Sequence, residues 1–138
     1  MARILAIDYG TKRVGLAVTD PLQIIATALE TIHSQDLFSY IKNYITTEEV
    51  ERIVIGMPKN LKNEATNATP HVVGVVRKLK KTFAEIAISE IDERFTSKIA
   101  FNTMIDSGIS KKKRAEKGTI DKLSATIILQ SYLEKHSL

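Results

Sequence analysis

Short apolar runs rich in β-branched residues alternate with turns in the first third of the chain. Residues 3–7 and 14–19 are each typical of a strand, and the tight turn at residues 9–11 joins them into a hairpin. A second turn follows at residues 20–21, and residues 24–32 then alternate loosely, which predicts a third strand. Connections this short favour three antiparallel strands.

From residue 34 onward the apolar spacing indicates helices that alternate with strands. Ser34 is suited to cap a helix whose apolar positions continue to residue 45, and residues 46–47 end it. Residues 52–56 form a continuous apolar run that is typical of a buried strand, which Pro58 stops. Pro70 suits the first turn of a second helix, which continues to about residue 83.

The last third of the chain contains one more strand and two more helices. Residues 86–91 predict the fifth strand, and Thr96 or Ser97 can cap a helix through about residue 105. A polar segment at 106–118 precedes a last helix at 119–135, which has apolar residues on two faces. The order β-β-β-α-β-α-β-α-α predicts an α/β fold with a mixed five-stranded sheet flanked by helices. At 138 residues without an internal repeat, we expect one domain, 1–138.

Composition excludes several classes of protein. The chain has no cysteine, which excludes disulfides and thiolate metal sites and favours a reducing compartment. Asp8 interrupts the N-terminal apolar run, so no signal peptide is expected, and no window holds the ~20 apolar residues of a membrane span. We therefore expect a cytoplasmic protein without a membrane partner.

The net charge of +4 is matched by one segment near the C-terminus. Residues 111–118, KKKRAEKG, contain five Lys/Arg and one Glu, which equals the whole excess of positive charge. A focused basic patch suits a polyanion such as nucleic acid, although a solvated basic loop has the same composition. The residues expected to contact a phosphate backbone are Lys111, Lys112, Lys113 and Arg114.

Acidic residues follow the ends of two predicted strands and open the last helix. Asp8 follows the first strand, and Asp92 and Glu93 follow the fifth. Asp121 begins the last helix. Because the functional crevice of an α/β sheet lies at the carboxyl ends of its parallel strands, these acids can share one cleft. Carboxylates that gather there repel one another unless a cation lies between them, and hard oxygen ligands suit Mg²⁺ or Mn²⁺.

Such a set of carboxylates supports phosphodiester hydrolysis without a protein nucleophile. Two ions about 4 Å apart can activate a water and stabilise the leaving oxygen. Each acid also has an ordinary structural explanation: Asp8 as a turn residue and Asp121 as a favourable charge at a helix N-terminus. Asp92 and Glu93 are adjacent and would point to opposite faces of a strand, so the pattern alone does not choose between them.

The hairpin around Asp8 is common to two classes of site. In nucleases of the ribonuclease H type the acid binds metal, whereas in actin-like and sugar-kinase ATPases a similar hairpin wraps phosphate. The ATPases need two such lobes that close on a nucleotide, and 138 residues supply one. The length of the chain therefore favours the nuclease.

Four segments together carry a more specific signal. They are IDYGTKRVGLAVTD at 7–20, VIGMPKNL at 54–61, DERFTS at 92–97 and GTIDKLSATIILQSYL at 118–133. In this order and spacing the chain resembles the YqgF/RuvX family, small bacterial relatives of the RuvC Holliday-junction resolvase. The resemblance implies a ribonuclease H-like fold and a metal-dependent nuclease. Its catalytic metal ligands would be Asp8, Glu93 and Asp121, which favours Glu93 over Asp92.

The same resemblance implies a substrate, and two departures from the family pattern accompany it. It implies processing of the 5′ end of pre-16S ribosomal RNA, with Holliday-junction resolution as the alternative. After Asn60 the family commonly has an Asp-Gly pair, where this chain has Leu61 and Lys62. RuvC-type sites often carry a fourth acid close to the third, and residues 122–124 supply none.

Contacts with the substrate are expected from basic side chains near the acids. Lys12 and Arg94 can contact phosphate beside the metal ions, and such contacts bind without choosing a sequence. These contacts therefore do not decide between RNA and DNA as the substrate. The sequence also leaves open whether the protein works as a monomer or as a homodimer. A further alternative is a ribosome-assembly factor that binds nucleic acid and whose acids are vestigial.

Overall fold

The centre of the fold is a five-stranded sheet. Its strands are β1 (Arg3–Tyr9), β2 (Arg13–Thr19), β3 (Ala26–His33), β4 (Val50–Met57) and β5 (Ala87–Asp92). The helices around it are α1 (Leu37–Thr47), α2 (Thr69–Thr82) and α5 (Lys117–His136), and a short 3₁₀ turn, η1 (Ser34–Asp36), precedes α1. The structure is a computed structural model, and it describes residues 2–10, 12–57, 69–92 and 117–136.

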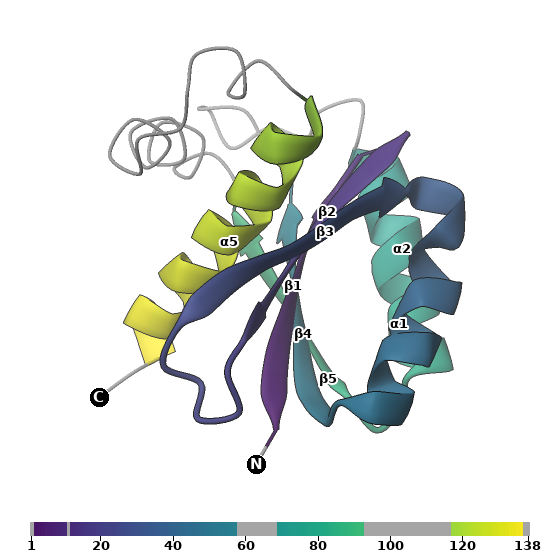
Figure 1. The fold of residues 1–138 in the computed structure, drawn as a ribbon. Helices are drawn as coiled ribbons and strands as arrows, with labels where there is room; N and C mark the ends of the chain where they lie inside the picture. The colour runs from purple at the N-terminus through teal and green to yellow at the C-terminus, as the bar shows by residue number, and fades with distance from the viewer. Residues whose placement is uncertain (1, 11, 58–68, 93–116, 137–138) are drawn as a thin grey trace.

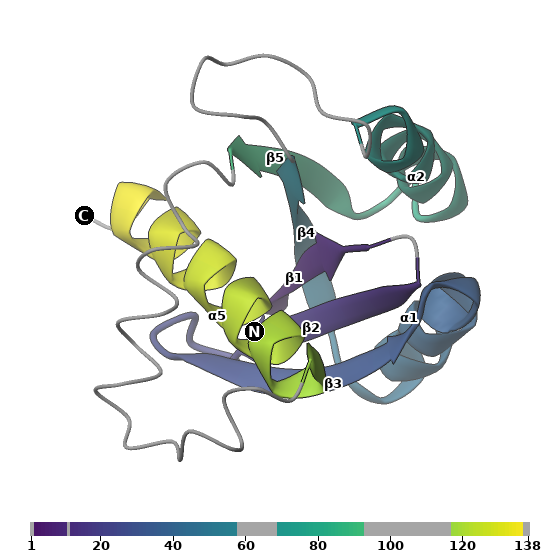
Figure 2. The same ribbon diagram turned by 90° about the horizontal axis from the view of Figure 1, so that it is seen from above.

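The strands lie side by side in the order β3-β2-β1-β4-β5 (Figure 1). β2 pairs antiparallel with both β1 and β3, whereas β4 pairs parallel with both β1 and β5. α1 and α2 cover one face of the sheet and α5 covers the other, as the view from above shows (Figure 2). The predicted α/β fold, with three antiparallel strands and then αβ alternation, is confirmed.

Alternate residues of β1 are buried on opposite sides of the sheet. Leu5 and Ile7 belong to the apolar cluster beneath α1 and α2, which includes Leu37, Ile41 and Leu79. Ile4 and Ala6 belong to the cluster beneath α5, whose other members include Val54, Ala125, Ile128 and Leu129. The central strand therefore contributes to two cores. Its odd-numbered residues face α1 and α2 and its even-numbered residues face α5, which also decides the face that each later residue occupies.

Two local predictions were wrong, each because a side chain captures backbone amides. The third strand begins at Ala26 because both carboxylate oxygens of Asp20 accept backbone N–H groups of the preceding loop, those of Ile24 and Ile25 at 2.8 Å among them. Ser34 does not cap α1. His33 instead accepts the amide of Gln35 at 3.1 Å through Nδ1 and starts the 3₁₀ turn.

The remaining helices and strands agree with the sequence prediction to within a few residues. Pro70 is the second residue of α2, as its missing N–H favours. The last helix begins at Lys117, two residues before the predicted start. The helix predicted at residues 96–105 lies outside the described residues. Among the helices that the structure describes, none combines the length and apolar character needed to cross a membrane.

Candidate active site

Asp8 is the second-last residue of β1 and lies on the side of the sheet that α5 covers. Ile4 and Ala6 pack against α5, and a strand repeats its side-chain direction every two residues, so Asp8 continues the same row. The residue is half-buried. Asp8 therefore extends, by one carboxylate, the row of side chains that begins with Ile4 and Ala6 in the core beneath α5.

Two buried glycines flank Asp8 on the neighbouring strands. Gly15 of β2 is its direct register partner. On the other side Ile7 pairs with Ile55, so the next residue of β4, Gly56, lies beside Asp8. Neither neighbour has a side chain beside the carboxylate, which is typical of a place where a ligand or another backbone approaches closely. The sequence pattern indicates a close approach at Gly15 but gives no such sign for Gly56, which ends the apolar run 52–56.

The turn that follows Asp8 requires a glycine. The amide of Gly10 donates to the carbonyl of Arg13 at 3.0 Å and closes the hairpin. A Cβ on Gly10 would come within 2.6 Å of that same carbonyl oxygen. Lys12 is exposed in this turn, and its carbonyl accepts the amide of Ser34 at 3.0 Å, which ties the turn to the end of β3. The predicted phosphate contact Lys12 is therefore close to the strand end that holds Asp8.

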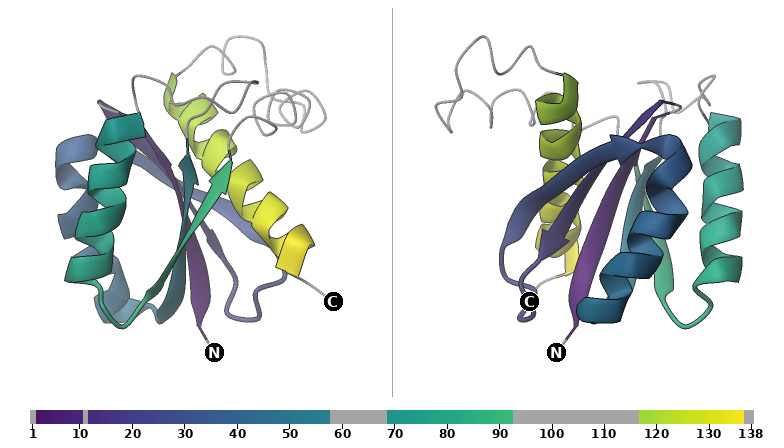
Figure 3. Two further views of the ribbon diagram at one scale, coloured as in Figure 1. Left: turned by 180° about the vertical axis from the view of Figure 1, so that it is seen from behind. Right: turned by 45° about the vertical axis from the view of Figure 1, so that its right-hand side comes forward.

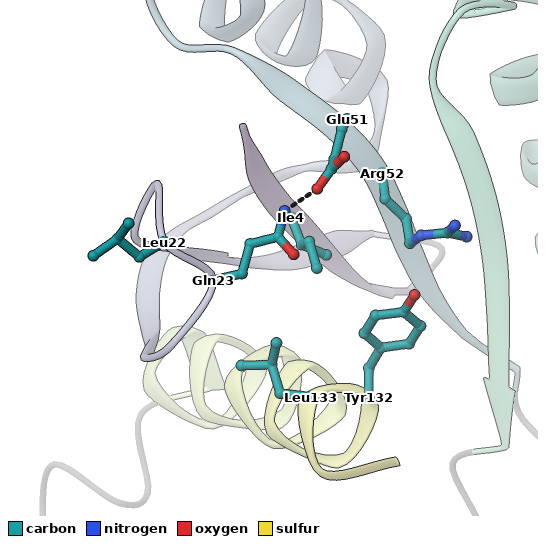
Figure 4. Close-up of a pocket in the computed structure, with 7 residues that line it drawn as sticks. All are labelled: Ile4, Leu22, Gln23, Glu51, Arg52, Tyr132 and Leu133. Carbon is teal, nitrogen blue, oxygen red and sulfur yellow. Dashed lines mark hydrogen bonds between the residues drawn. The ribbon is translucent and has the colours of Figure 1, made fainter. Parts of the chain in front are cut away.

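α5 runs in the opposite direction to β1. Near its C-terminal end, Tyr132 and Leu133 line a hollow together with Ile4 and Arg52, which stand at the beginnings of β1 and β4 (Figure 4). The first turns of α5 consequently lie toward the end of β1 that contains Asp8, as Figure 1 also shows. From Tyr132 back to Asp121 the helix spans about 17 Å, and from Ile4 to Asp8 the strand spans about 13 Å.

Asp121 occupies a helical position in register with the buried stripe of α5. Ala125 and Ile128, four and seven residues later, are buried against the sheet. Residues at these spacings share one face of a helix. The backbone of Asp121 therefore stands on the sheet-facing stripe, one turn nearer the strand ends than Ala125.

The parallel strands β1, β4 and β5 all finish at the same end of the sheet, and β5 ends beside β4. Asp92, its last residue, is in register with Met57 of β4, and β4 separates β5 from β1. Neighbouring strands are about 4.8 Å apart, so the ends of β1 and β5 are separated by about 10 Å. Ile91 packs in the cluster beneath α5, whereas Ile88 packs in the cluster beneath α1 and α2.

Several predicted site residues fall outside the described residues: Glu93, Arg94, Lys111, Lys112, Lys113 and Arg114. Within the described ranges, no three His, Asp or Glu residues form a group able to hold a metal ion. The three-carboxylate set of Asp8, Glu93 and Asp121 therefore stays a prediction. What the structure brings together is the end of β1, the glycines of β2 and β4, and the first turns of α5.

The hollow near the beginnings of β1 and β4 lies at the opposite end of the strands from Asp8. It has a volume of about 370 Å³ (Figure 4). The Arg52 guanidinium lies 5.8 Å from the centre of the Tyr132 ring and also donates to the hydroxyl of Ser89. Gln23 donates to Glu51 and to the carbonyl of Ala2. Arg52 thus links β4 to β5 and to the end of α5, whereas Gln23 links the loop after β2 to the start of the chain and to β4.

Comparison with known proteins identifies the family. The family model described as "RuvX: Holliday junction resolvase" matches residues 2–135. The chain belongs to the RuvX family. A protein of Flavobacterium psychrophilum named "Putative pre-16S rRNA nuclease" is 50% identical over 135 residues, with 98% of each chain covered. A protein of the same name from Bacteroides fragilis strain YCH46 is 49% identical over the full length of both chains.

Solved structures agree on the fold of this RuvX protein. RuvC of Thermus thermophilus in complex with a Holliday junction substrate superposes with a TM-score of 0.60 at 12% identity, over 99% of this chain and 97% of RuvC. A second structure of T. thermophilus RuvC gives a TM-score of 0.58 at 14% identity, over 96% and 95% of the chains. The predicted ribonuclease H-like fold and the family resemblance are both confirmed, and the family decides for a nuclease over an ATPase.

Proposed function

We propose that this RuvX protein is an endonuclease that hydrolyses phosphodiester bonds with the help of Mg²⁺ or Mn²⁺ and processes the 5′ end of pre-16S ribosomal RNA. Support for the substrate comes from the names of relatives about 50% identical over almost the whole chain. Support for the chemistry comes from one observation: Asp8 lies between two glycines where β1 ends, facing the helix that carries Asp121. A ribosomal substrate implies that the protein acts in the cytoplasm.

The residues present fit a divalent cation. We infer that Asp8, Glu93 and Asp121 hold it, since carboxylate oxygens are its preferred ligands and their mutual repulsion needs a cation. The family resemblance favours Glu93 over Asp92, and Glu93 comes two positions in the sequence after Ile91, which packs beneath α5. The bound ions would supply water activation and stabilisation of the leaving oxygen.

Basic residues of this chain would orient the substrate. We expect Lys12, exposed in the turn after Asp8, and Arg94, next to Glu93 in sequence, to contact phosphate near the cation. Lys111, Lys112, Lys113 and Arg114 would hold the backbone further along the strand. These contacts fix the position of the phosphodiester without reading its sequence, so selection of the cleavage point depends on RNA structure.

The test is cleavage by the wild type and by Asp8→Asn, with Mn²⁺ and with a chelator. The substrates are a pre-16S leader, an unrelated single-stranded RNA and a four-way DNA junction. We expect metal-dependent cleavage of the leader by the wild type and its loss in Asp8→Asn. Asp36→Asn, which changes an exposed acid in the 3₁₀ turn before α1, is the matched control and should cleave normally. Equal cleavage by Asp8→Asn would contradict the assignment of Asp8.

Junction cleavage is the second candidate function because the family model itself carries the description of a Holliday junction resolvase. Paired cuts in a four-way junction need two active sites related by twofold symmetry, hence a homodimer. Cleavage of the junction alone, together with a dimer mass in sedimentation, would favour this function. Intact binding without any cleavage, unchanged by Asp8→Asn, would instead indicate a ribosome-assembly factor with vestigial acids.

A further inference from the structure

The charged residues within the two helices opposite α5 are all basic. α1 and α2 lie side by side on that face of the sheet (Figure 3), where the rings of Phe38 and Phe83 stack with centroids 6.5 Å apart. The two helices contain five Lys/Arg and no Asp or Glu. The five are Lys42, Arg77, Lys78, Lys80 and Lys81. This layer alone has more positive charge than the net +4 of the whole chain, so the basic character is not confined to residues 111–118.

Four of these cations form what we call the α2 basic cluster: Arg77, Lys78, Lys80 and Lys81. All four are exposed. The opposite side of α2 is buried through Val72, Val76 and Leu79, so the charges stand along the flank and the outer side of the helix. In the part of the chain that the structure describes, no carboxylate forms an ion pair with any of the four.

Interactions within the helical layer account for only part of the cluster. Arg77 and Lys81 are four residues apart, and Lys78 and Lys81 are three apart, which are the spacings at which like charges repel on a helix. The helix dipole favours Lys80 and Lys81 in the last turn, but its effect falls off beyond that turn. Lys78 is held over the Phe38 ring, with Nζ 4.2 Å from its centre, which fixes one charge at the seam between the helices. A dense positive charge of this kind suits an external polyanion.

We propose that the α2 basic cluster binds the sugar–phosphate backbone of the nucleic acid at a distance from the cleavage point. This inference rests on the proposed nuclease function. α2 connects the end of β4 to the beginning of β5. It therefore runs from the end of the sheet at which Asp8 lies, where β1, β4 and β5 finish, toward the end at which these strands begin. The cluster begins eight residues into α2 and lies about 12–18 Å along it. A substrate that reaches both places must therefore extend several nucleotides, at ~3.4 Å per step, beyond the reacting phosphate.

The α2 basic cluster favours nucleic acids that are long enough and carry enough negative charge to reach it, and it does not distinguish between base sequences. Lysine binds phosphate as a point charge, and contacts to the backbone fix the orientation of a nucleic acid without reading it. A folded RNA precursor presents such a backbone on more than one side of the protein. An anionic membrane surface is the other polyanion that a basic helix can bind, and the experiment separates the two.

The experiment compares the quadruple variant R77Q/K78Q/K80Q/K81Q with the charge-retaining control R77K/K78R/K80R/K81R. Circular dichroism and thermal unfolding establish that both are folded, and the double variant R77Q/K81Q provides an intermediate case. Binding to a long RNA hairpin is measured over a range of salt concentrations, and cleavage is measured on that hairpin and on an oligonucleotide of about four nucleotides. The slope of log K against log[salt] is negative, and its steepness should decrease by about 0.7–0.9 for every phosphate that the variant no longer binds.

We expect the neutralised variant to bind the hairpin more weakly, with a salt slope that is less steep by about 2–4, and the control to match the wild type. The KM for the hairpin should rise, while cleavage of the short oligonucleotide stays unchanged. An unchanged salt slope would overturn the inference, as would an equal loss on the short oligonucleotide. Loss of binding to vesicles with anionic lipid, without any change for RNA, would overturn it in favour of a membrane surface.

The same measurements keep this inference separate from the proposed nuclease function. If the wild type cleaves no substrate but the salt slope is still less steep in the neutralised variant, the nuclease function is wrong and the binding surface stands. If cleavage depends on Asp8 but the salt slope does not change, the nuclease stands and the binding surface is wrong.

Discussion

Asp8 of β1 is the direct register partner of Gly15 of β2, so the candidate catalytic carboxylate stands beside a residue without a side chain. We expect Gly15→Ala to lower metal-dependent cleavage by about tenfold or more, because a methyl group there occupies the space beside the carboxylate and shifts the reacting groups. The measurement is kcat with Mn²⁺ at a temperature at which circular dichroism reports a folded protein.

Ala17→Val is the matched control for Gly15→Ala. Ala17 lies two residues further along β2 and is buried in the same cluster beneath α5. Overpacking there should cost stability, typically about 1–3 kcal/mol, without touching the surroundings of Asp8. Equal losses of activity in the two variants would show that Gly15 matters for packing alone.

Gly10→Ala should destabilise the protein by roughly 1–3 kcal/mol. The added Cβ would come within 2.6 Å of the carbonyl oxygen of Arg13, and that oxygen accepts the hydrogen bond that closes the turn. The backbone of the turn must therefore move. Urea denaturation measures the change, and a midpoint equal to that of the wild type would contradict the close contact.

Gly74→Ala should have the opposite effect and stabilise the protein by about 0.5–1 kcal/mol. Gly74 lies within α2, is exposed, and a Cβ added to it meets no atom within 4 Å. Alanine then reduces the conformational freedom of the unfolded chain at no steric cost. Thermal and urea unfolding should both shift toward higher stability while cleavage stays unchanged.

Thr19→Val should cost about 1–3 kcal/mol. Where the register between β1 and β4 shifts near the start of β1, the amide of Ile4 donates to Oγ1 of the fully buried Thr19 at 2.9 Å. Valine has nearly the same shape but leaves this buried N–H without its acceptor. Thr27→Val on the exposed side of β3 is the control and should change the free energy of unfolding far less. A small cost at Thr19 would mean that another acceptor replaces the hydroxyl.

The loop between β2 and β3 should make stability depend on pH at the acid end. The backbone amides of Ile25, Ile24 and Leu22 donate to the Asp20 carboxylate and lower the pKa of Asp20 below its usual 3.8. A carboxyl whose pKa is lower in the folded than in the unfolded state stabilises the fold above pH 3.8, and this contribution is lost as the pH falls through the folded-state pKa.

Asp20→Asn tests this linkage. The variant should be less stable than the wild type near pH 7, and the difference should shrink below pH 3.8. Urea denaturation at both pH values gives the two free energies of unfolding. A difference that does not change with pH would exclude the carboxylate as the source of the stabilisation.

Much of the secondary structure follows from the sequence because it depends on near neighbours. The alternation in the first two strands, the continuous run at residues 52–56 and the proline that opens α2 predict elements that the structure confirms. The prediction fails at Ile24 and Ile25, two apolar β-branched residues that the pattern assigns to a strand. Both side chains are exposed, at 67% and 63%, because the Asp20 carboxylate holds their amides in a loop.

The sequence also determined the family and indicated Asp8 as the central acid, since short motifs in fixed order carry that signal. Only the tertiary structure decided what surrounds Asp8: β4 lies next to β1, which brings Gly56 to its side, and the first turns of α5 lie toward the same end of the sheet as the end of β1. It also decided that α1 and α2, whose charged residues are all basic, lie on the same side of the sheet. These relationships join residues far apart in the chain, and they depend on strand order, register and helix direction, which local periodicity does not specify.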